Sequence, residues 1–327
     1  MTRALAMISG GLDSVLAAKL MKDQGIDVIG ICFSSYFFGA DNAVRMAKQI
    51  DIPLKVIDFS KEHFEIVKNP PHGYGKNMNP CIDCHAMMMN WCGKMMNEYK
   101  ADFIITGEVL NQRPMSQNRS SLDLVKKESG FGNKILRPLC AKNLLPTEME
   151  IQGIVEREKL LAISGRDRKV QMKLADEWGI MDYPSPAGGC KLTEPNYSKR
   201  LKDLLLHKNN PEERDIELLK FGRHFRLSDR TKIISSRTGD EGNKIEKCLN
   251  EKDIIFFAEN YSGSLVVITG DAQKEDIIFA AKVTGRYSKG KDEGTVNIKY
   301  GHFNHQLNEH IEIKPASEEE IAQYIIE

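Results

Sequence analysis

The first two-thirds of the chain alternate short apolar runs with segments in which apolar residues recur every three or four positions. The apolar runs predict buried strands, and the periodic segments between them predict helices with one apolar face. Strands that alternate with helices through short links form a parallel sheet covered by helices on both faces. The predicted strands cover residues 4–8, 27–33, 54–59, 102–107 and 135–139, and the predicted helices include 15–21, 41–50 and 81–99.

Two later segments, 157–163 and 168–179, predict a pair of helices, whereas the polar residues 108–132 predict an irregular loop. From about residue 223 the pattern changes to short strands punctuated by Gly, Asn and Asp, which predicts a separate β-rich module. We therefore expect an α/β protein with a Rossmann-like parallel sheet and a second, smaller β-rich α+β domain. The expected divisions are 1–205 for the parallel-sheet domain, 206–221 for a helical connector, 222–302 for the β-rich domain and 303–327 for an acidic tail.

Composition sets limits on partners and compartment. The formal net charge is zero because residues 303–327, with six acidic and one basic residue, mask two mildly basic parts. Residues 198–302 contain 20 basic and 17 acidic residues, a balance that permits an RNA partner. No apolar run approaches the ~20 residues of a membrane helix, and no signal peptide is visible ahead of the first strand. Seven cysteines, an odd number, favour a reducing compartment, so we expect a cytoplasmic protein.

The most informative stretch is Ser9-Gly10-Gly11-Leu12-Asp13-Ser14, between the first strand and the first helix. Glycines let backbone N–H groups approach an anion, and a helix start adds further N–H groups and the positive end of its dipole. Ser9 and Ser14 can add hydroxyl donors, and Asp13 can hold Mg²⁺ beside phosphates. No Gly-Lys-Ser/Thr follows, so this is not a Walker loop. The stretch predicts a phosphate cradle, with an ordinary capped strand–helix turn as the alternative.

Parallel sheets bind ligands at the carboxyl ends of their strands. Phe33 and Gly107 lie at the ends of two other predicted strands, so we expect them at the same edge as the cradle, in contact with the nucleotide. Glu108 and Gln117 follow on this edge as candidates for contact with substrate or metal. Arg137 is a candidate for contact with phosphate, with a structural ion pair as the alternative.

A second informative stretch is Asn79-Pro80-Cys81-Ile82-Asp83-Cys84-His85. Asn79 is a good N-cap and Pro80 suits a first helical turn, so Cys81 and Cys84 should lie in that turn on nearly the same face. A helix start lowers the pKa of a thiol, which favours a nucleophile or a metal ligand. A redox pair, half of a zinc site and two small buried side chains are the alternatives. Cys190 follows two glycines and supplies a third thiol.

Taken together, SGGLDS, NPCIDCH, TGEVLNQRPMSQ and PAGGC resemble the tRNA thiolation branch of the PP-loop ATP pyrophosphatases, which includes the 4-thiouridine and 2-thiouridine synthetases. The resemblance covers residues 1–205. It implies ATP cleavage between the α and β phosphates, adenylation of a uridine carbonyl, and catalytic roles for Asp13, Cys81 and Cys190. In cluster-bearing members a CxxC pair and one distant cysteine hold a [4Fe–4S] cluster, a count that Cys81, Cys84 and Cys190 match.

Near the C-terminal end, a basic and aromatic stretch begins at Phe221 and recurs around Tyr287. Residues 222–302 are similar to the RNA-binding domain of the NFACT family. Arginine and lysine with interleaved aromatic residues suit phosphate contact and base stacking, and a solvated charged face is the alternative. The candidate RNA-binding residues are Arg223, Arg226, Arg230, Lys232 and Lys289.

The leading hypothesis is an ATP-dependent tRNA or RNA sulfurtransferase that uses ATP, Mg²⁺ and a sulfur donor, with a [4Fe–4S] cluster or a persulfide relay as the sulfur carrier. One alternative is a PP-loop ligase that forms amides, which would not need the three thiols. Another is a non-catalytic RNA-binding adaptor that senses ATP, which would leave Asp13 and the thiols without a role.

Overall fold

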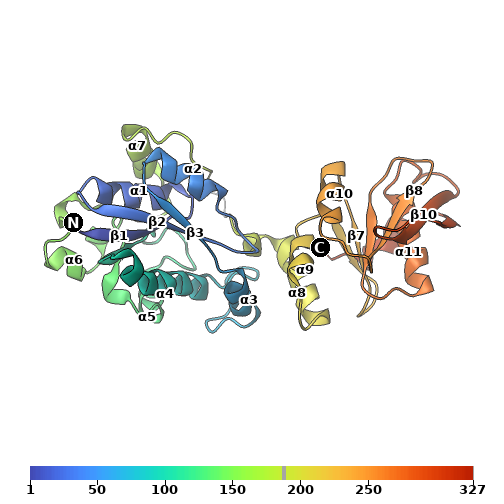
Figure 1. Cartoon of the computed structure of the whole chain (residues 1–327), viewed down its shortest axis with the longest axis horizontal. Helices are drawn as coiled ribbons and strands as arrows, with labels where there is room; N and C mark the ends of the chain where they lie inside the picture. The colour runs from blue at the N-terminus through green and yellow to red at the C-terminus, as the bar shows by residue number, and fades with distance from the viewer. Residues whose placement is uncertain (186–188, 327) are drawn as a thin grey trace. The chain divides into compact units, whose positions relative to one another are not determined.

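The computed structural model describes residues 1–185 and 189–326, and the chain divides into two compact units (Figure 1). The first unit is Met1–Thr193, and the second begins at Glu194. Of the PAGGC segment, residues 186–188 lie outside the described residues. None of the helices in the described ranges combines the length and the apolar character that a membrane crossing requires.

The first unit contains a five-stranded parallel sheet in the order β3-β2-β1-β4-β5, which confirms the predicted α/β fold. The chain passes from β1 to β2 on one side and later returns to pair β4 on the other side of β1. Ligands bind where the strand order reverses in this way, at the carboxyl end of β1. The strands are β1 (Arg3–Met7), β2 (Asp27–Ser34), β3 (Leu54–Asp58), β4 (Phe103–Ile105) and β5 (Ile135–Leu136).

Helices cover both faces of this sheet, because successive side chains of a strand point to opposite faces. Ala4 and Ala6 of β1 belong to the apolar cluster of α1, α2 and α7, whereas Leu5 belongs to that of α4 and α5. Figure 1 shows the two groups on opposite sides of the sheet. The helices are α1 (Leu12–Lys22), α2 (Asp41–Gln49), α3 (Ser60–Lys68), α4 (Cys81–Tyr99), α5 (Arg119–Glu128), α6 (Glu148–Ile151) and α7 (Lys169–Glu177).

Two predictions for this unit are wrong. The expected loop 108–132 contains α5, because Asn118 caps its start by accepting from the Ser121 N–H, and Leu122 and Val125 form a short apolar face. Conversely, residues 157–163 form one turn of 3₁₀ helix followed by extended backbone. The Leu161 N–H donates to the Pro138 carbonyl, so this segment pairs with the chain after β5 instead of with itself.

The second unit contains a six-stranded antiparallel sheet in the order β11-β10-β8-β9-β7-β6, as expected for a separate β-rich module. Its strands are β6 (Arg223–Arg226), β7 (Lys232–Ser235), β8 (Ile254–Ala258), β9 (Val266–Thr269), β10 (Val296–His302) and β11 (Glu309–Ile313). Its helices are α8 (Pro195–His207), α9 (Glu213–Leu218), α10 (Gly239–Glu246), α11 (Lys274–Arg286) and α12 (Glu318–Ala322).

The acidic C-terminal segment forms part of the second unit. Strand β11 pairs with β10 along five residues, and the Ile326 N–H donates to the His224 carbonyl on β6. Acidic residues of α12 pair with basic residues of α11, through Lys282–Glu320 and Arg286–Glu318. Internal ion pairs therefore neutralise part of the negative charge of this segment. A count of charges along the sequence does not reveal these pairs.

Candidate functional site

The loop Ser9–Ser14 lies at the carboxyl end of β1, where the strand order reverses. Gly10 has a φ of +82°, and a Cβ there would lie 2.6 Å from the backbone nitrogen of Ala43 and 2.6 Å from the Cβ of Asn42. Only glycine fits this position without moving the start of α2. The turn of the loop therefore brings the starts of α1 and α2 together at one place.

The start of α1 has no side-chain cap. Gly11 is its N-cap residue, and the Ser14 hydroxyl donates back to the Gly11 carbonyl at 2.8 Å. A Cβ on Gly107 would lie 2.5 Å from the Ser14 nitrogen, so the end of the β4 strand packs directly against this turn. The arrangement leaves backbone N–H groups at a helix start, which is a ready anion site.

Asp13 is held by an amide pair that the sequence did not reveal. Gln112 Nε2 donates to Asp13 Oδ2 at 2.7 Å, and Gln171 Nε2 donates to Gln112 Oε1 at 3.3 Å. The other carboxylate oxygen, Asp13 Oδ1, is buried and has no hydrogen-bond partner among the described residues. Gln112 lies inside the TGEVLNQRPMSQ segment, whereas Gln171 lies on α7 without any sequence signal. An unpartnered carboxylate oxygen beside an anion cradle fits a bound Mg²⁺.

Glu108 and Arg137 form an ion pair with each other, whereas the sequence suggested contacts with substrate, metal or phosphate. Arg137 Nε donates to Glu108 Oε2 at 2.8 Å, and both side chains are buried. Burial alone would raise the pKa of Glu108, but Arg137 and His85 lower it to about 2. Of the two possibilities for Arg137, this geometry corresponds to the structural ion pair. Removing Glu108 would leave the buried charge of Arg137 without its carboxylate, at a cost of about 3–5 kcal/mol.

Glu108 also connects the Ser9–Ser14 loop to helix α4, which carries Cys81 and Cys84. His85 Nδ1 lies 3.0 Å from Glu108 Oε1, and Glu108 directly follows Gly107, which touches Ser14. Because His85 is the neighbour of Cys84, this chain of contacts places the first turn of α4 at the same edge of the sheet as the cradle. The neighbouring Asp83 is occupied elsewhere, since it accepts from the His72 backbone N–H at 3.1 Å.

Helix α4 begins at Cys81, as the sequence predicts, although its N-cap residue is Pro80 and not Asn79. Burial raises the pKa of Cys81 above its ordinary value, more than the Arg113 charge and a hydrogen bond from Asn79 lower it. The predicted lowering of the thiol pKa is therefore wrong for this conformation. Loss of water around the thiol outweighs the favourable helix start.

Cys84 is buried, whereas Cys81 and Cys190 are partly exposed. Burial raises the pKa of Cys84 well above its ordinary value, and the negative charges of Cys190 and Cys81 raise it further. Cys81 and Cys190 therefore both lie near enough to Cys84 to affect its ionisation. Cys81 and Cys84 are neighbours in the sequence, whereas Cys190 comes near Cys84 only through the fold, and a joint site of the three stays a prediction.

Two hydrogen bonds to backbone carbonyl groups hold the segment that carries Cys190. The Lys191 N–H donates to the Phe37 carbonyl at 3.0 Å, and Asn77 Nδ2 donates to the Thr193 carbonyl at 2.7 Å.

Within residues 1–185 and 189–326, no set of three or more His, Cys, Asp or Glu has the arrangement of a metal site. The described side chains thus form no site for a single metal ion, whereas a [4Fe–4S] cluster needs cysteine thiolates, of which Cys81, Cys84 and Cys190 supply three.

Phe33 and Gln117 lie deeper than the sequence suggested. Phe33 is buried in an aromatic group, with its ring centroid 5.1 Å from that of Phe59 and 6.4 Å from that of Trp91. Only its backbone therefore remains for contact with a nucleotide. Gln117 is also buried, and its Oε1 atom lacks a partner among the described residues.

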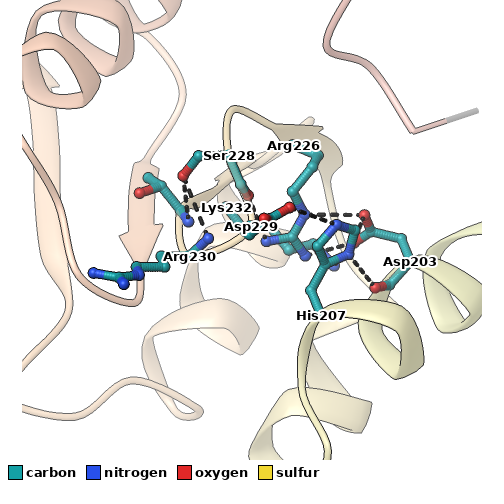
Figure 2. A network of polar contacts seen from close by, with 8 residues as sticks. Asp203, His207, Arg226, Ser228, Asp229, Arg230 and Lys232 are labelled. Carbon is teal, nitrogen blue, oxygen red and sulfur yellow. Dashed lines mark hydrogen bonds and ion pairs between the residues drawn. The ribbon is translucent and has the colours of Figure 1, made fainter.

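In the second unit, two of the candidate RNA-binding residues are occupied by one carboxylate (Figure 2). Arg226 donates to both oxygens of Asp203, at 3.0 and 2.7 Å, and Lys232 Nζ lies 3.4 Å from Asp203 Oδ2. Burial lowers the pKa of Lys232 to about 8, against the opposing effect of Asp203. These contacts join α8 to β6 and β7, so they stabilise the unit internally.

The other three candidates face outward to different degrees. The Arg223 guanidinium lies over the Tyr287 ring, 4.5 Å from its centroid. Arg230 is exposed, and its side chain extends away from the Asp203 network in Figure 2. Lys289 is exposed at the mouth of a groove that also contains Arg237 and Lys291. The structure therefore separates the five candidates into an internal pair and an outward set.

Known protein families match each unit separately. Residues 1–144 match the family model described as Thiamine biosynthesis protein (ThiI), and residues 222–325 match that described as NFACT protein RNA binding domain. Both matches confirm resemblances that the sequence motifs predicted.

Curated relatives match over part of their length. The tRNA-specific 2-thiouridylase MnmA of Karelsulcia muelleri (strain GWSS) is 26% identical over 215 residues, which are 55% of this chain and 56% of that protein. The MnmA protein of Rhizobium leguminosarum bv. trifolii (strain WSM2304) is 32% identical over 35% of this chain and 33% of that protein. This chain thus spans about half, or less, of the length of these relatives.

Among solved structures, the 4-thiouridine synthetase–RNA complex with bound ATP aligns with a TM-score of 0.34 at 16% identity, over 55% of this chain and 52% of that one. The chain therefore joins an N-terminal part that matches the ThiI family to a C-terminal part that matches the NFACT RNA-binding domain.

Proposed function

We propose that this protein is an ATP-dependent RNA sulfurtransferase that replaces the oxygen of a uridine carbonyl with sulfur. One observation carries the proposal: contacts through Gly107, Glu108 and His85 connect the phosphate cradle to the helix of Cys81 and Cys84. An anion cradle and a group of thiols at one edge of a parallel sheet suit a reaction with a nucleotide step and a sulfur step. The match of residues 1–144 to the ThiI family and the similarity to the tRNA-specific 2-thiouridylase MnmA support it.

In the first step ATP binds at Ser9–Ser14. The uridine carbonyl oxygen attacks the α-phosphorus, the bond to the bridging oxygen breaks, and pyrophosphate leaves. Backbone N–H groups at Gly10 and Gly11 and the start of α1 stabilise the charge that develops on pyrophosphate. Asp13 would hold Mg²⁺ through its unpartnered Oδ1. The bound Mg²⁺ would neutralise phosphate charge.

In the second step a persulfide on Cys81 or Cys190 attacks the adenylated carbon, and AMP leaves. The thiolate of the other cysteine then attacks the protein-bound sulfur, breaks the S–S bond and releases the thionucleoside. This leaves a disulfide between the two cysteines, which a dithiol reductant must reduce with two electrons before a sulfur donor reloads the site. The partial exposure of Cys81 and Cys190 supports these roles, since Cys84 is buried.

In this proposal the second unit binds the RNA substrate. Its match to an RNA-binding domain and its outward-facing cations support this role. We place the protein in the cytoplasm, where thiols remain reduced and tRNA is modified. The odd number of cysteines in the sequence supports that compartment.

Nucleoside analysis tests the reaction class. RNA from a strain that lacks this gene should lose one thionucleoside in mass spectrometry of digested nucleosides, and expression of the chain should restore it. Expression of the Asp13→Asn variant should not restore it. An unchanged set of thionucleosides in the deletion strain would contradict the proposal and favour an amide-forming ligase or an ATP-sensing adaptor.

The amide pair should be needed to orient Asp13. In Gln171→Leu, Gln112 loses its buried partner, so Asp13 Oδ1 should no longer be fixed toward the cradle. We expect pyrophosphate release to fall about fivefold, in line with roughly 1 kcal/mol for one hydrogen bond, and half-saturation with Mg²⁺ to require a higher concentration. Gln152→Leu, at an exposed position of the same unit, is the control. Normal Mg²⁺ dependence in Gln171→Leu would remove the positioning role.

A further inference from the structure

A groove of about 780 Å³ opens on the second unit. Four parts of the unit line it: α10 with the residues before it, Phe257 of β8, residues 262–265, and residues 286–291 at and after the end of α11. These segments lie far apart in the sequence and belong to different elements. The groove is separate from the Asp203 network, none of whose residues lines it.

The lining of the groove contains more cations than carboxylates: Arg237, Arg286, Lys289 and Lys291 against Glu246. Two of these cations have partners next to the groove, since Arg237 pairs with Glu241 and Arg286 pairs with Glu318. Lys289 and Lys291 are exposed, and neither has a carboxylate within ion-pair distance in the part of the chain that the structure describes. Cations without a carboxylate partner on a concave surface attract a polyanion.

The backbone that carries the two lysines is rigidly attached. The Lys289 N–H donates to the Ser262 carbonyl at 2.9 Å, and Gly263 and Ser288 form a β-bridge. A Cβ on Gly290 would lie 2.7 Å from the Tyr261 ring, so the chain passes directly over that ring. Because this spacing is fixed before binding, little conformational freedom of the backbone is lost when a ligand contacts both lysines.

The groove also contains aromatic surface. Phe257 and Tyr287 are both partly exposed and both line it, and the Arg223 guanidinium lies 4.5 Å from the Tyr287 ring centroid. Aromatic rings and guanidinium planes stack with unpaired bases, whereas bases inside a duplex are already stacked. The groove therefore offers cations that can contact phosphates beside aromatic rings that can stack on bases. This combination favours a single-stranded nucleic acid over a duplex or a simple anion.

We propose that this groove binds an unpaired segment of RNA, with Lys289 and Lys291 at phosphates and Phe257 and Tyr287 at a base. The inference rests on the proposed function, in which the second unit holds RNA, and it specifies the surface and the form of RNA. It moves the RNA contact away from Arg226 and Lys232, which are already bound to Asp203.

The test uses the full chain and a fluorescent 12-nucleotide oligouridine, with anisotropy measured at several KCl concentrations. The variant Lys289→Ala/Lys291→Ala should raise Kd at least tenfold at low salt. The slope of log Kd against log salt should decrease by about 1.4, at roughly 0.7 per phosphate contact on single strands. The control Lys252→Ala/Lys274→Ala removes the same charge from exposed positions outside the groove and should change Kd less than twofold.

Photo-crosslinking gives a second readout that does not depend on a variant. An oligonucleotide with 5-bromouridine should crosslink to peptides that contain Phe257 or Tyr287. Crosslinks confined to other peptides would overturn the proposal, as would equal loss of affinity in the control double variant. Loss of affinity in Arg230→Ala, with normal binding by the groove variant, would also overturn it while leaving RNA binding by this unit intact. If the wild-type chain bound no RNA, the proposed function itself would fail.

Discussion

In a chain that carries Asp13→Asn, we expect pyrophosphate release from ATP to fall at least about a hundredfold, because asparagine removes the negative charge that would hold Mg²⁺ at the cradle. Asparagine still offers an oxygen to Gln112 Nε2, so the contact that positions this side chain can persist. The fall should therefore report the loss of charge and not a rearranged loop. Malachite-green detection of released phosphate after pyrophosphatase treatment measures the rate.

The matched control is Asp23→Asn, which neutralises the aspartate that caps the other end of the same helix. Asp23 is distant from the cradle in the fold and pairs with Lys19 at the surface. We expect normal pyrophosphate release from this control and similar thermal melting for both variants. A normal rate in Asp13→Asn would show that the loop Ser9–Ser14 does not serve as the catalytic nucleotide site.

The sequence predicted the strand, turn and helix around Ser9–Ser14 well because these parts are contiguous. Ser9–Ser14 contains the turn glycines, the hydroxyls and the carboxylate, and the flanking residues form a strand and a helix as expected. The amide pair behind Asp13 was not predictable in the same way. Gln112 is 99 residues from Asp13, and Gln171 reaches Gln112 from α7, so only the fold brings them together.

The sequence also did not reveal which charged side chains are available to bind a ligand. Arg226 and Lys232 have the composition of an RNA-binding stretch, but Asp203 on a preceding helix occupies both. A sequence pattern counts cations without showing which of them already have partners. The helix start at Cys81 likewise predicted a lowered pKa, and burial reverses its direction. Local rules for charge fail where tertiary burial supplies the larger free energy.

The second large effect concerns the cysteines. We expect Cys81→Ser and Cys190→Ser each to abolish formation of the thionucleoside while pyrophosphate release stays within about twofold of normal. In the proposed order of steps adenylation precedes sulfur transfer, and neither thiol takes part in attack at the α-phosphorus. Cys248→Ser, a partly exposed thiol of the second unit, is the control and should affect neither step. Loss of pyrophosphate release in Cys81→Ser would place that thiol in the nucleotide step instead.

Iron analysis and disulfide mapping decide how the sulfur is carried. A relay predicts an active, iron-free protein that forms a Cys81–Cys190 disulfide after one turnover without reductant, detectable by mass spectrometry of unreduced peptides. A [4Fe–4S] cluster predicts about four irons per chain after anaerobic purification, with loss of most of the iron in each single Cys→Ser variant. The described conformation favours the relay, because Cys84 is buried whereas Cys81 and Cys190 are partly exposed. Stoichiometric iron that Cys84→Ser removes would overturn the relay, since Cys84 has no role in it.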